Sequence, residues 1–276
     1  MSQLIKLRDQ IKTIKTIQKI TQAMRLVSMS IHSRLNNQKV FLKNYQSELN
    51  KISTIVGATE KQLSENINPV TKNLVILIGS QKGLCGAFNQ DVLRKFITYK
   101  KSKDDIELMV IGKKLVDITQ RKNQVDQKII KFTHATISEI TNKIFNYITE
   151  QNNFDEVIFI SNSSKNFFVH VTKITSVLPL QSNNPDIMKT LTEPYIWEQT
   201  STEIATILTS NQIRLNIYCL LFDSLIAEYA ARFRSMDNAT RNANNLLETT
   251  ERQYRKVRQA KITRELVELS AIFQTK

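Results

Sequence analysis

The positions of the helix-breaking residues constrain this chain more than any other sequence feature. The sequence holds four prolines and five glycines, yet only Gly57 among them lies in the first 68 or the last 82 residues. Glycine and proline are the residues that most strongly disfavour a helix. The sequence therefore predicts one long uninterrupted helix at each end, around a centre with ordinary breaks.

The lengths of these helices exclude a purely compact fold. At the rise of an α-helix, residues 3–56 would span roughly 80 Å and residues 203–273 roughly 105 Å. A globule of 276 residues is only about 40 Å across. We therefore expect the helices to protrude from the core or to brace another structure, which indicates a mechanical or scaffolding role.

The apolar residues of the first helix recur in steps of three and four, the spacing of a coiled-coil seam. The last helix is apolar to Phe233, largely polar from Arg234 to Lys256, and apolar again beyond it. Because a folded domain joins the two helices, they can pair antiparallel, and the longer last helix would overhang. The expected seam of the first helix comprises Leu4, Leu7, Ile11, Ile14, Ile17, Ile20, Met24, Val27 and Ile31, then Leu42, Tyr45, Leu49, Ile52 and Val56.

The net charge of +14 is concentrated on the first helix. Residues 1–56 hold ten basic residues against two acidic ones, whereas residues 195–276 hold eleven against nine. A stripe of four basic residues lies one position away from the expected seam. An acidic protein surface, a nucleic acid or an anionic membrane would complement such a stripe, and a solvated face is the simpler alternative. The basic stripe comprises Arg8, Lys12, Lys15 and Lys19.

The middle of the chain alternates between strand-like and helix-like segments, which is typical of a mostly parallel sheet in an α/β domain. We expect three parts: the first helix at 1–57, a Rossmann-like α/β domain at 70–180 and the last helix at 203–276. A linker with three prolines occupies residues 179–202. The expected strands are 73–79, 106–112, 128–133, 156–161 and 167–178, and the expected helices are 91–101, 113–121 and 137–151.

No pattern in the sequence indicates catalysis or a bound cofactor. The glycines of the segment 79–89 fit neither a P-loop nor a dinucleotide-binding fingerprint, so we interpret this segment as a structural turn between strand and helix. The cysteines and histidines lack the spacing of metal ligands. No apolar run is long enough for a membrane span, and the first residues lack the apolar core of a signal peptide.

Three segments, in order, resemble the gamma subunit of the rotary ATP synthase. Near the start, residues 11–24 read IKTIKTIQKITQAM, similar to the family's I-x-S-x-x-x-x-x-K-I-T-x-A-M. In the centre, residues 82–89 read KGLCGAFN, similar to R-G-L-C-G-x-x-N. Near the end, EYAAR at 228–232 and RQAKITREL at 258–266 follow the family's terminal helix. Departures include Gln81 and Arg241, where the family usually has aspartate.

The resemblance implies a non-catalytic rotor shaft, present once per complex, that couples ion translocation to ATP synthesis or hydrolysis. An antiparallel coiled coil of the two ends would fill a ring of alpha and beta subunits. The α/β domain at its foot would meet the epsilon subunit and the membrane c-ring on the cytoplasmic side of a bacterial plasma membrane, as a peripheral protein. The family positions that face the ring correspond here to Met24, Arg232, Gln259, Thr263 and Glu268.

Two other classes of protein stay open on the residues alone. One is a basic coiled-coil scaffold that binds nucleic acid, although residues 1–40 contain no aromatic side chain to interleave with the basic stripe. The other is a nucleotide-binding enzyme that uses the middle domain, which the glycine spacing disfavours. With the resemblance included, we expect neither nucleic acid nor direct membrane insertion.

Overall fold

The computed structural model describes residues 2–56, 72–101, 106–120, 125–151, 154–166, 169–179 and 200–274. The chain forms two compact units: unit 1 holds residues 1–29 and 233–276, and unit 2 holds residues 30–232. This division differs from the expected limits 1–57, 70–180 and 203–276, because each long helix contributes to both units. Gly57 and nearly all of the expected linker lie outside the described residues.

Both ends of the chain are single helices, as the distribution of glycine and proline predicts. Helix α1 runs from Ser2 to Val56 over 55 residues, and helix α6 runs from Ser201 to Gln274 over 74 residues. Both match the expected limits to within two residues. Glu203 lies in the first turn of α6, where a negative charge interacts favourably with the helix dipole.

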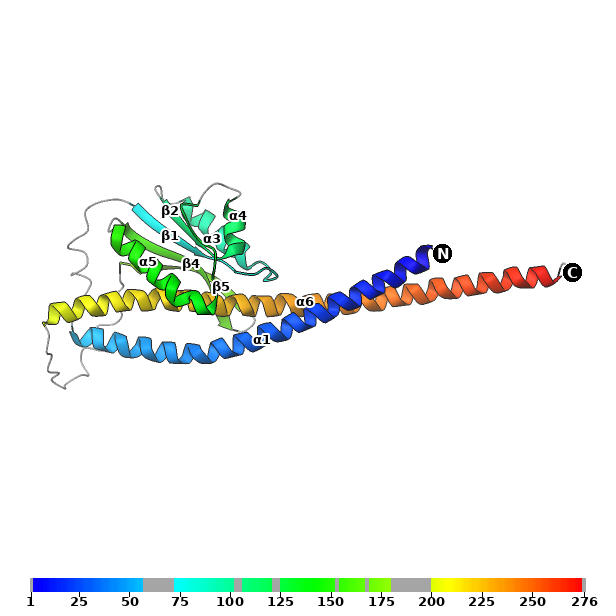
Figure 1. The fold of residues 1–276 in the computed structure, drawn as a ribbon, viewed down its shortest axis with the longest axis horizontal. Helices are drawn as coiled ribbons and strands as arrows, with labels where there is room; N and C mark the ends of the chain where they lie inside the picture. Colours follow the sequence, from blue (N-terminus) through cyan, green and yellow to red (C-terminus); the bar gives the residue numbers. More distant parts are fainter. Residues whose placement is uncertain are drawn as a thin grey trace. The chain divides into compact units, whose positions relative to one another are not determined.

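Unit 2 contains a five-stranded sheet in the order β3-β2-β1-β4-β5 (Figure 1). Strands β1 (Lys72–Ile78), β2 (Ile106–Ile111), β3 (Gln127–Ile129) and β4 (Phe154–Asn166) pair in parallel. Strand β5 (Val169–Leu178) pairs antiparallel with β4. The mostly parallel sheet expected from the sequence is therefore confirmed.

Helices cover both faces of this sheet. Helices α3 (Phe88–Lys100) and α4 (Lys113–Gln120) pack on the face to which Val75 and Leu77 point. Helix α5 (Ile137–Gln151) and residues 213–226 of α6 pack on the opposite face, against Leu74, Ile76 and Ile78. Because β1 lies at the centre and is buried on both faces, its sequence is a continuous apolar run.

Two of the expected strands differ from the structure. The expected strand 128–133 is only β3, because the chain then turns, buries Phe132 and forms the 3-10 helix η1 (His134–Thr136). The expected strand 156–161 is longer, since its pairing with β5 continues as far as Asn166. Long-range pairing of this kind is not encoded in local periodicity. None of the helices in the described ranges is sufficiently long and apolar to cross a membrane.

Candidate functional site

Within unit 1, α1 and α6 pair antiparallel (Figure 1). The amide of Gln18 donates to the side-chain oxygen of Asn244 at 2.7 Å, and an Arg25 Nη1 lies 2.7 Å from Asp237 Oδ1. The step of seven residues from Gln18 to Arg25 is matched by seven residues backwards, from Asn244 to Asp237. This is the heptad register of an antiparallel coiled coil, as the sequence predicts.

From Gln18 onward, the α1 side of this seam is polar. Between the two pairs just described, the buried hydroxyl of Thr240 donates to that of Thr21 at 3.0 Å. The hydroxyl of Ser28 is also buried and donates to the carbonyl of Met24 at 2.8 Å. Buried polar groups tolerate only partners that satisfy them, so the contact between Thr21 and Thr240 helps to specify one register of the two helices.

The expected seam of α1 is wrong at several positions beyond Ile14, although Leu42 and Leu49 are partly or fully buried as expected. Ile17, Ile20 and Val27 are 47%, 55% and 58% exposed, so they do not face α6. A left-handed coiled coil repeats every 3.5 residues, and this repeat carries the seam from Ile14 to Gln18 and onward through polar residues. The expected seam follows the hydrophobic residues of α1 instead of the 3.5-residue repeat. In unit 2 the same one-residue error applies at Tyr45 and Ile52, both of which are exposed.

The basic stripe lies on the surface of unit 1, one position from the seam, as expected. All four of its side chains are exposed, and Lys15 Nζ lies 3.0 Å from Glu251 Oε1 across the helix pair. An exposed ion pair of this kind contributes at most about 1 kcal/mol. The acidic surface that we expect the stripe to meet stays a prediction.

Asp237 lies between two arginines. Arg25 on α1 contacts one carboxylate oxygen at 2.7 Å, and Arg241, one turn along α6, contacts the other at 2.9 Å. The hydrogen bond from Arg25 is the main cause that holds the pKa of Asp237 below its ordinary value, with Arg241 adding a smaller attraction. Arg241, which stands where the family usually has aspartate, thus reinforces an interhelical contact.

The far end of α6 overhangs, as expected. Lys261 is partly buried, and the side chains described after it on α6, residues 262–270, are all exposed. The expected contact residues Gln259, Thr263 and Glu268 are therefore exposed. The Thr263 hydroxyl donates to the Gln259 carbonyl at 3.0 Å, and Arg264 Nε lies 2.9 Å from Glu268 Oε1.

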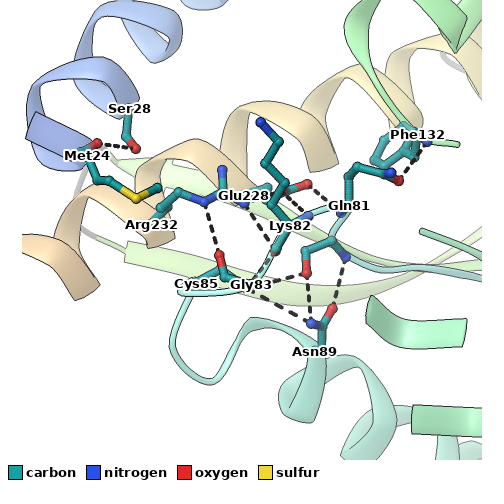
Figure 2. A network of polar contacts seen from close by, with 11 residues as sticks. Met24, Ser28, Gln81, Lys82, Gly83, Cys85, Asn89, Phe132, Glu228 and Arg232 are labelled. Atoms are coloured by element: carbon teal, nitrogen blue, oxygen red, sulfur yellow. Dashed lines mark hydrogen bonds and ion pairs between the residues drawn. The ribbon is translucent and has the colours of Figure 1, made fainter. Parts of the chain in front are cut away.

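In unit 2, the glycine-rich segment forms the turn between β1 and α3 (Figure 2). Asn89 fixes its beginning, because its side chain accepts from the Ser80 N–H at 2.9 Å and donates to the Ser80 hydroxyl at 2.8 Å. The Gln81 side chain accepts from the Phe132 N–H at 2.9 Å. Gly86 then adopts a φ of +63°, a conformation that favours glycine.

Two charged side chains of α6 are buried against this turn (Figure 2). The carboxylate of Glu228 accepts from the N–H groups of Gln81 at 3.3 Å and Lys82 at 3.5 Å. Arg232 donates to the carbonyls of Gly83 and Lys82, each at 3.2 Å. Glu228 and Arg232 also pair with each other, and each side chain is only 3% exposed.

The sequence placed Arg232 among surface contact residues, whereas the structure places its guanidinium inside unit 2. Glu228 is paired with Arg232 on the same helix and is buried with it. The sequence around Arg232 and Glu228 contains a signal that predicts their burial. An acid and a base one turn apart, within the most apolar part of α6, are expected to be buried together with polar partners.

The hydrogen bonds of this turn differ from those of a phosphate-binding loop. In phosphate-binding loops, successive backbone N–H groups and a helix N-terminus face the phosphate. Here the N–H groups of Gln81 and Lys82 face the chain's own carboxylate. The geometry fits the interpretation of a structural turn. Among the described residues, no three His, Cys, Asp or Glu side chains cluster in a way that could hold a metal ion.

Comparison with known proteins identifies the family. A family model described as ATP synthase matches residues 3–273. The ATP synthase gamma chain of Rickettsia typhi is 30% identical over 287 residues, which cover 98% of this chain and 98% of that protein. The chain belongs to the ATP synthase gamma-chain family. The gamma chain of Bdellovibrio bacteriovorus is 28% identical over 290 residues, covering 98% of this chain and 97% of its relative.

The fold agrees with this family. A chain in the cryo-EM structure of the Euglena gracilis mitochondrial ATP synthase, in the OSCP/F1/c-ring assembly, superposes with a TM-score of 0.72 at 16% identity. That alignment covers 99% of this chain and 94% of the other. A chain in the rotor of the same synthase superposes with a TM-score of 0.67 at 15% identity. The terminal helices around a central sheet are thus the gamma-chain fold.

Proposed function

We propose that this gamma chain is the central rotor shaft of an ATP synthase. It couples ion translocation through a membrane c-ring to ATP synthesis or hydrolysis on the beta subunits, as one copy within the ring of alpha and beta subunits. The c-ring and the epsilon subunit bind the α/β domain. The complete match to the gamma-chain family supports this proposal, as does the likeness to the rotor of a solved ATP synthase.

One observation carries the mechanical part of the proposal: the surface of unit 1 is apolar where its seam is polar. Ile17, Ile20 and Val27 are exposed on α1, beside the basic stripe. An isolated soluble helix pair would bury such residues, since each exposed aliphatic side chain forfeits roughly 1.5–3 kcal/mol of burial. A helix pair that turns inside a protein ring needs this outer apolar surface and a seam that fixes its own register.

The mechanism follows from symmetry. A single asymmetric shaft contacts three catalytic sites in three different ways. A shaft residue that contacts one beta conformation better than the others lowers the free energy of that conformation, and only such differential contact shifts the population. Rotation carries the bias from site to site, so torque from ion flow drives product release and ATP hydrolysis drives the reverse rotation.

The exposed family positions are the proposed contacts with the ring. Gln259, Thr263 and Glu268 lie on the exposed part of α6, and Met24 is half-buried on α1. The basic stripe faces acidic protein surface in this arrangement. We assign no catalytic residue to the chain. In its glycine-rich turn, the N–H groups of Gln81 and Lys82 bind the chain's own Glu228. The bacterial relatives support a peripheral location on the cytoplasmic side of the plasma membrane.

Reconstitution tests the proposal directly. The other subunits of an ATP synthase, with the membrane subunits held in vesicles, are reconstituted with and without this chain. We expect ATP-driven ion pumping only when the chain is present, and no nucleotide hydrolysis by the purified chain alone. Steady ATP hydrolysis by the chain, or equal pumping without it, would exclude the role of a non-catalytic shaft.

Substitution of Met24 by lysine should uncouple the complex while leaving it assembled. The new lysine adds a positive charge to a surface that already carries the basic stripe. Because the site is partly exposed to solvent, we expect the repulsion between these charges to be roughly 1 kcal/mol. We expect the number of ions pumped per ATP hydrolysed to fall about fivefold. Met24→Leu, which has a similar volume, is the control, and an unchanged pumping ratio in Met24→Lys would contradict the contact.

A further inference from the structure

We propose that Glu228 and Arg232 form a lock that fixes the glycine-rich turn of the α/β domain to helix α6, so that the two move as one body. We define the lock as these two side chains together with the backbone of residues 81–83. The inference rests on the proposed rotor function, because a lock of this kind matters only where torque passes between the domain and the helix.

The chemistry of the lock is more specific than an ion pair. The carboxylate of Glu228 meets backbone N–H groups, and the guanidinium of Arg232 meets backbone carbonyls. The polarity of each side chain is therefore set by the main chain of the turn as well as by its partner. Both side chains are nearly inaccessible to solvent, where charged groups need such partners.

Small residues bring α6 close enough for these contacts. Ala227 and Ala231 precede Glu228 and Arg232 by one position each, and both are buried against Cys85 of the turn and Phe88 of α3. A larger side chain at either alanine would lift the helix away from the turn. The contacts thus combine close packing with hydrogen bonds, which is the arrangement that resists shear between two elements.

The turn is itself held firmly to the rest of the domain. Asn89 fixes Ser80, and the Gln81 side chain reaches the backbone of Phe132. A force applied to Arg232 is therefore transmitted to β1, to α3 and to the segment after β3. Helix α6 continues without interruption from unit 2 into unit 1, so the lock lies where the domain grips the rotating helix.

Hydrogen–deuterium exchange in the assembled complex tests the lock. Arg232→Lys keeps the charge and loses the planar guanidinium, and Glu228→Gln keeps the shape and loses the charge. We expect exchange of the residue 80–86 backbone to become at least about tenfold faster in each variant, with ion pumping per ATP reduced and the protection of β1 and β2 retained. The matched controls are Arg252→Lys and Glu248→Gln, since that pair has the same spacing on α6 and is 70% and 62% exposed.

A charge exchange separates the lock from a simple ion pair. In the double variant Glu228→Arg with Arg232→Glu, a simple pair would reform and restore slow exchange. We expect no restoration, because arginine would then face N–H groups and glutamate would face carbonyls. Unchanged exchange of residues 80–86 in Arg232→Lys and Glu228→Gln, or full rescue by the double variant, would overturn the lock. Hydrogen–deuterium exchange tests the lock, whereas ion pumping tests the rotor role. A failure of the rotor role would therefore change the pumping result and leave the exchange result as expected.

Discussion

Replacement of Asn245 by proline is expected to abolish most of the coupled activity of the complex. Asn245 is exposed on α6, away from the seam with α1. Proline there removes one backbone hydrogen bond, clashes with the preceding turn and costs about 3 kcal/mol or more. The resulting kink redirects every later residue of α6, including the exposed positions Gln259, Thr263 and Glu268.

The measurement is ATP-driven ion pumping by membrane vesicles that contain the complete complex. We expect a fall of at least about tenfold for Asn245→Pro. Asn245→Ala removes the same side chain without bending the helix and should change pumping by less than about twofold, because surface substitutions are usually near neutral. Equal pumping by the two variants would show that the stiffness of α6 is not required.

Replacement of Gly112 by alanine is expected to destabilise unit 2 strongly. Gly112 has a φ of +99°, and an added Cβ would lie 2.6 Å from the carbonyl oxygen of Gly79. The positive φ and the Gly79 carbonyl oxygen both belong to the backbone, so rotation of a side chain cannot relieve the strain or the overlap. Strain and overlap together cost about 3 kcal/mol or more.

Thermal unfolding of the full chain measures this cost. For a domain of this size we expect Gly112→Ala to lower Tm by roughly 6–12 °C. Gly83→Ala is the control, because the nearest atom to its added Cβ is the Lys114 Cε at 3.9 Å. A loss of stability in Gly83→Ala equal to that in Gly112→Ala would mean that the close approach of Gly112 to Gly79 is not what requires glycine.

Most of the fold could be predicted from local sequence. The long helices follow from the distribution of glycine and proline, and the central strands follow from short apolar runs that end at Gly79 and Gly112. Helix α5 begins and ends where its amphipathic pattern does, at 137 and 151. These features depend on residues that are close in the chain.

The seam of the coiled coil could not be located from hydrophobicity. Its residues in unit 1 include Gln18, Thr21 and Ser28, whereas Ile17 and Ile20 are exposed. In an isolated coiled coil the apolar residues mark the seam. In a helix pair with a further surface to cover, the outer face is apolar too, and only the strict 3.5-residue repeat from Leu4 identifies the seam.

The backbone partners of Arg232 were also beyond local sequence. Its partners in the turn lie 149 and 150 residues away in the chain, and the contacts depend on the backbone path of that turn. The family resemblance predicts a surface role for Arg232, because a sequence motif specifies residue types but not which residues surround them in the fold. The same long separation hid the role of Glu228.

Direct observation of rotation tests the central claim that this chain is a rotor. A bead is attached through Lys95→Cys, an exposed position on α3, to complexes immobilised by their beta subunits. Burial raises the pKa of the Cys219 thiol to about 11, so near neutral pH a maleimide reacts with the exposed new thiol. We predict that ATP drives rotation in one direction, with three pauses per turn for three catalytic sites. Continued ATP hydrolysis while the bead only fluctuates about one angle would contradict the account.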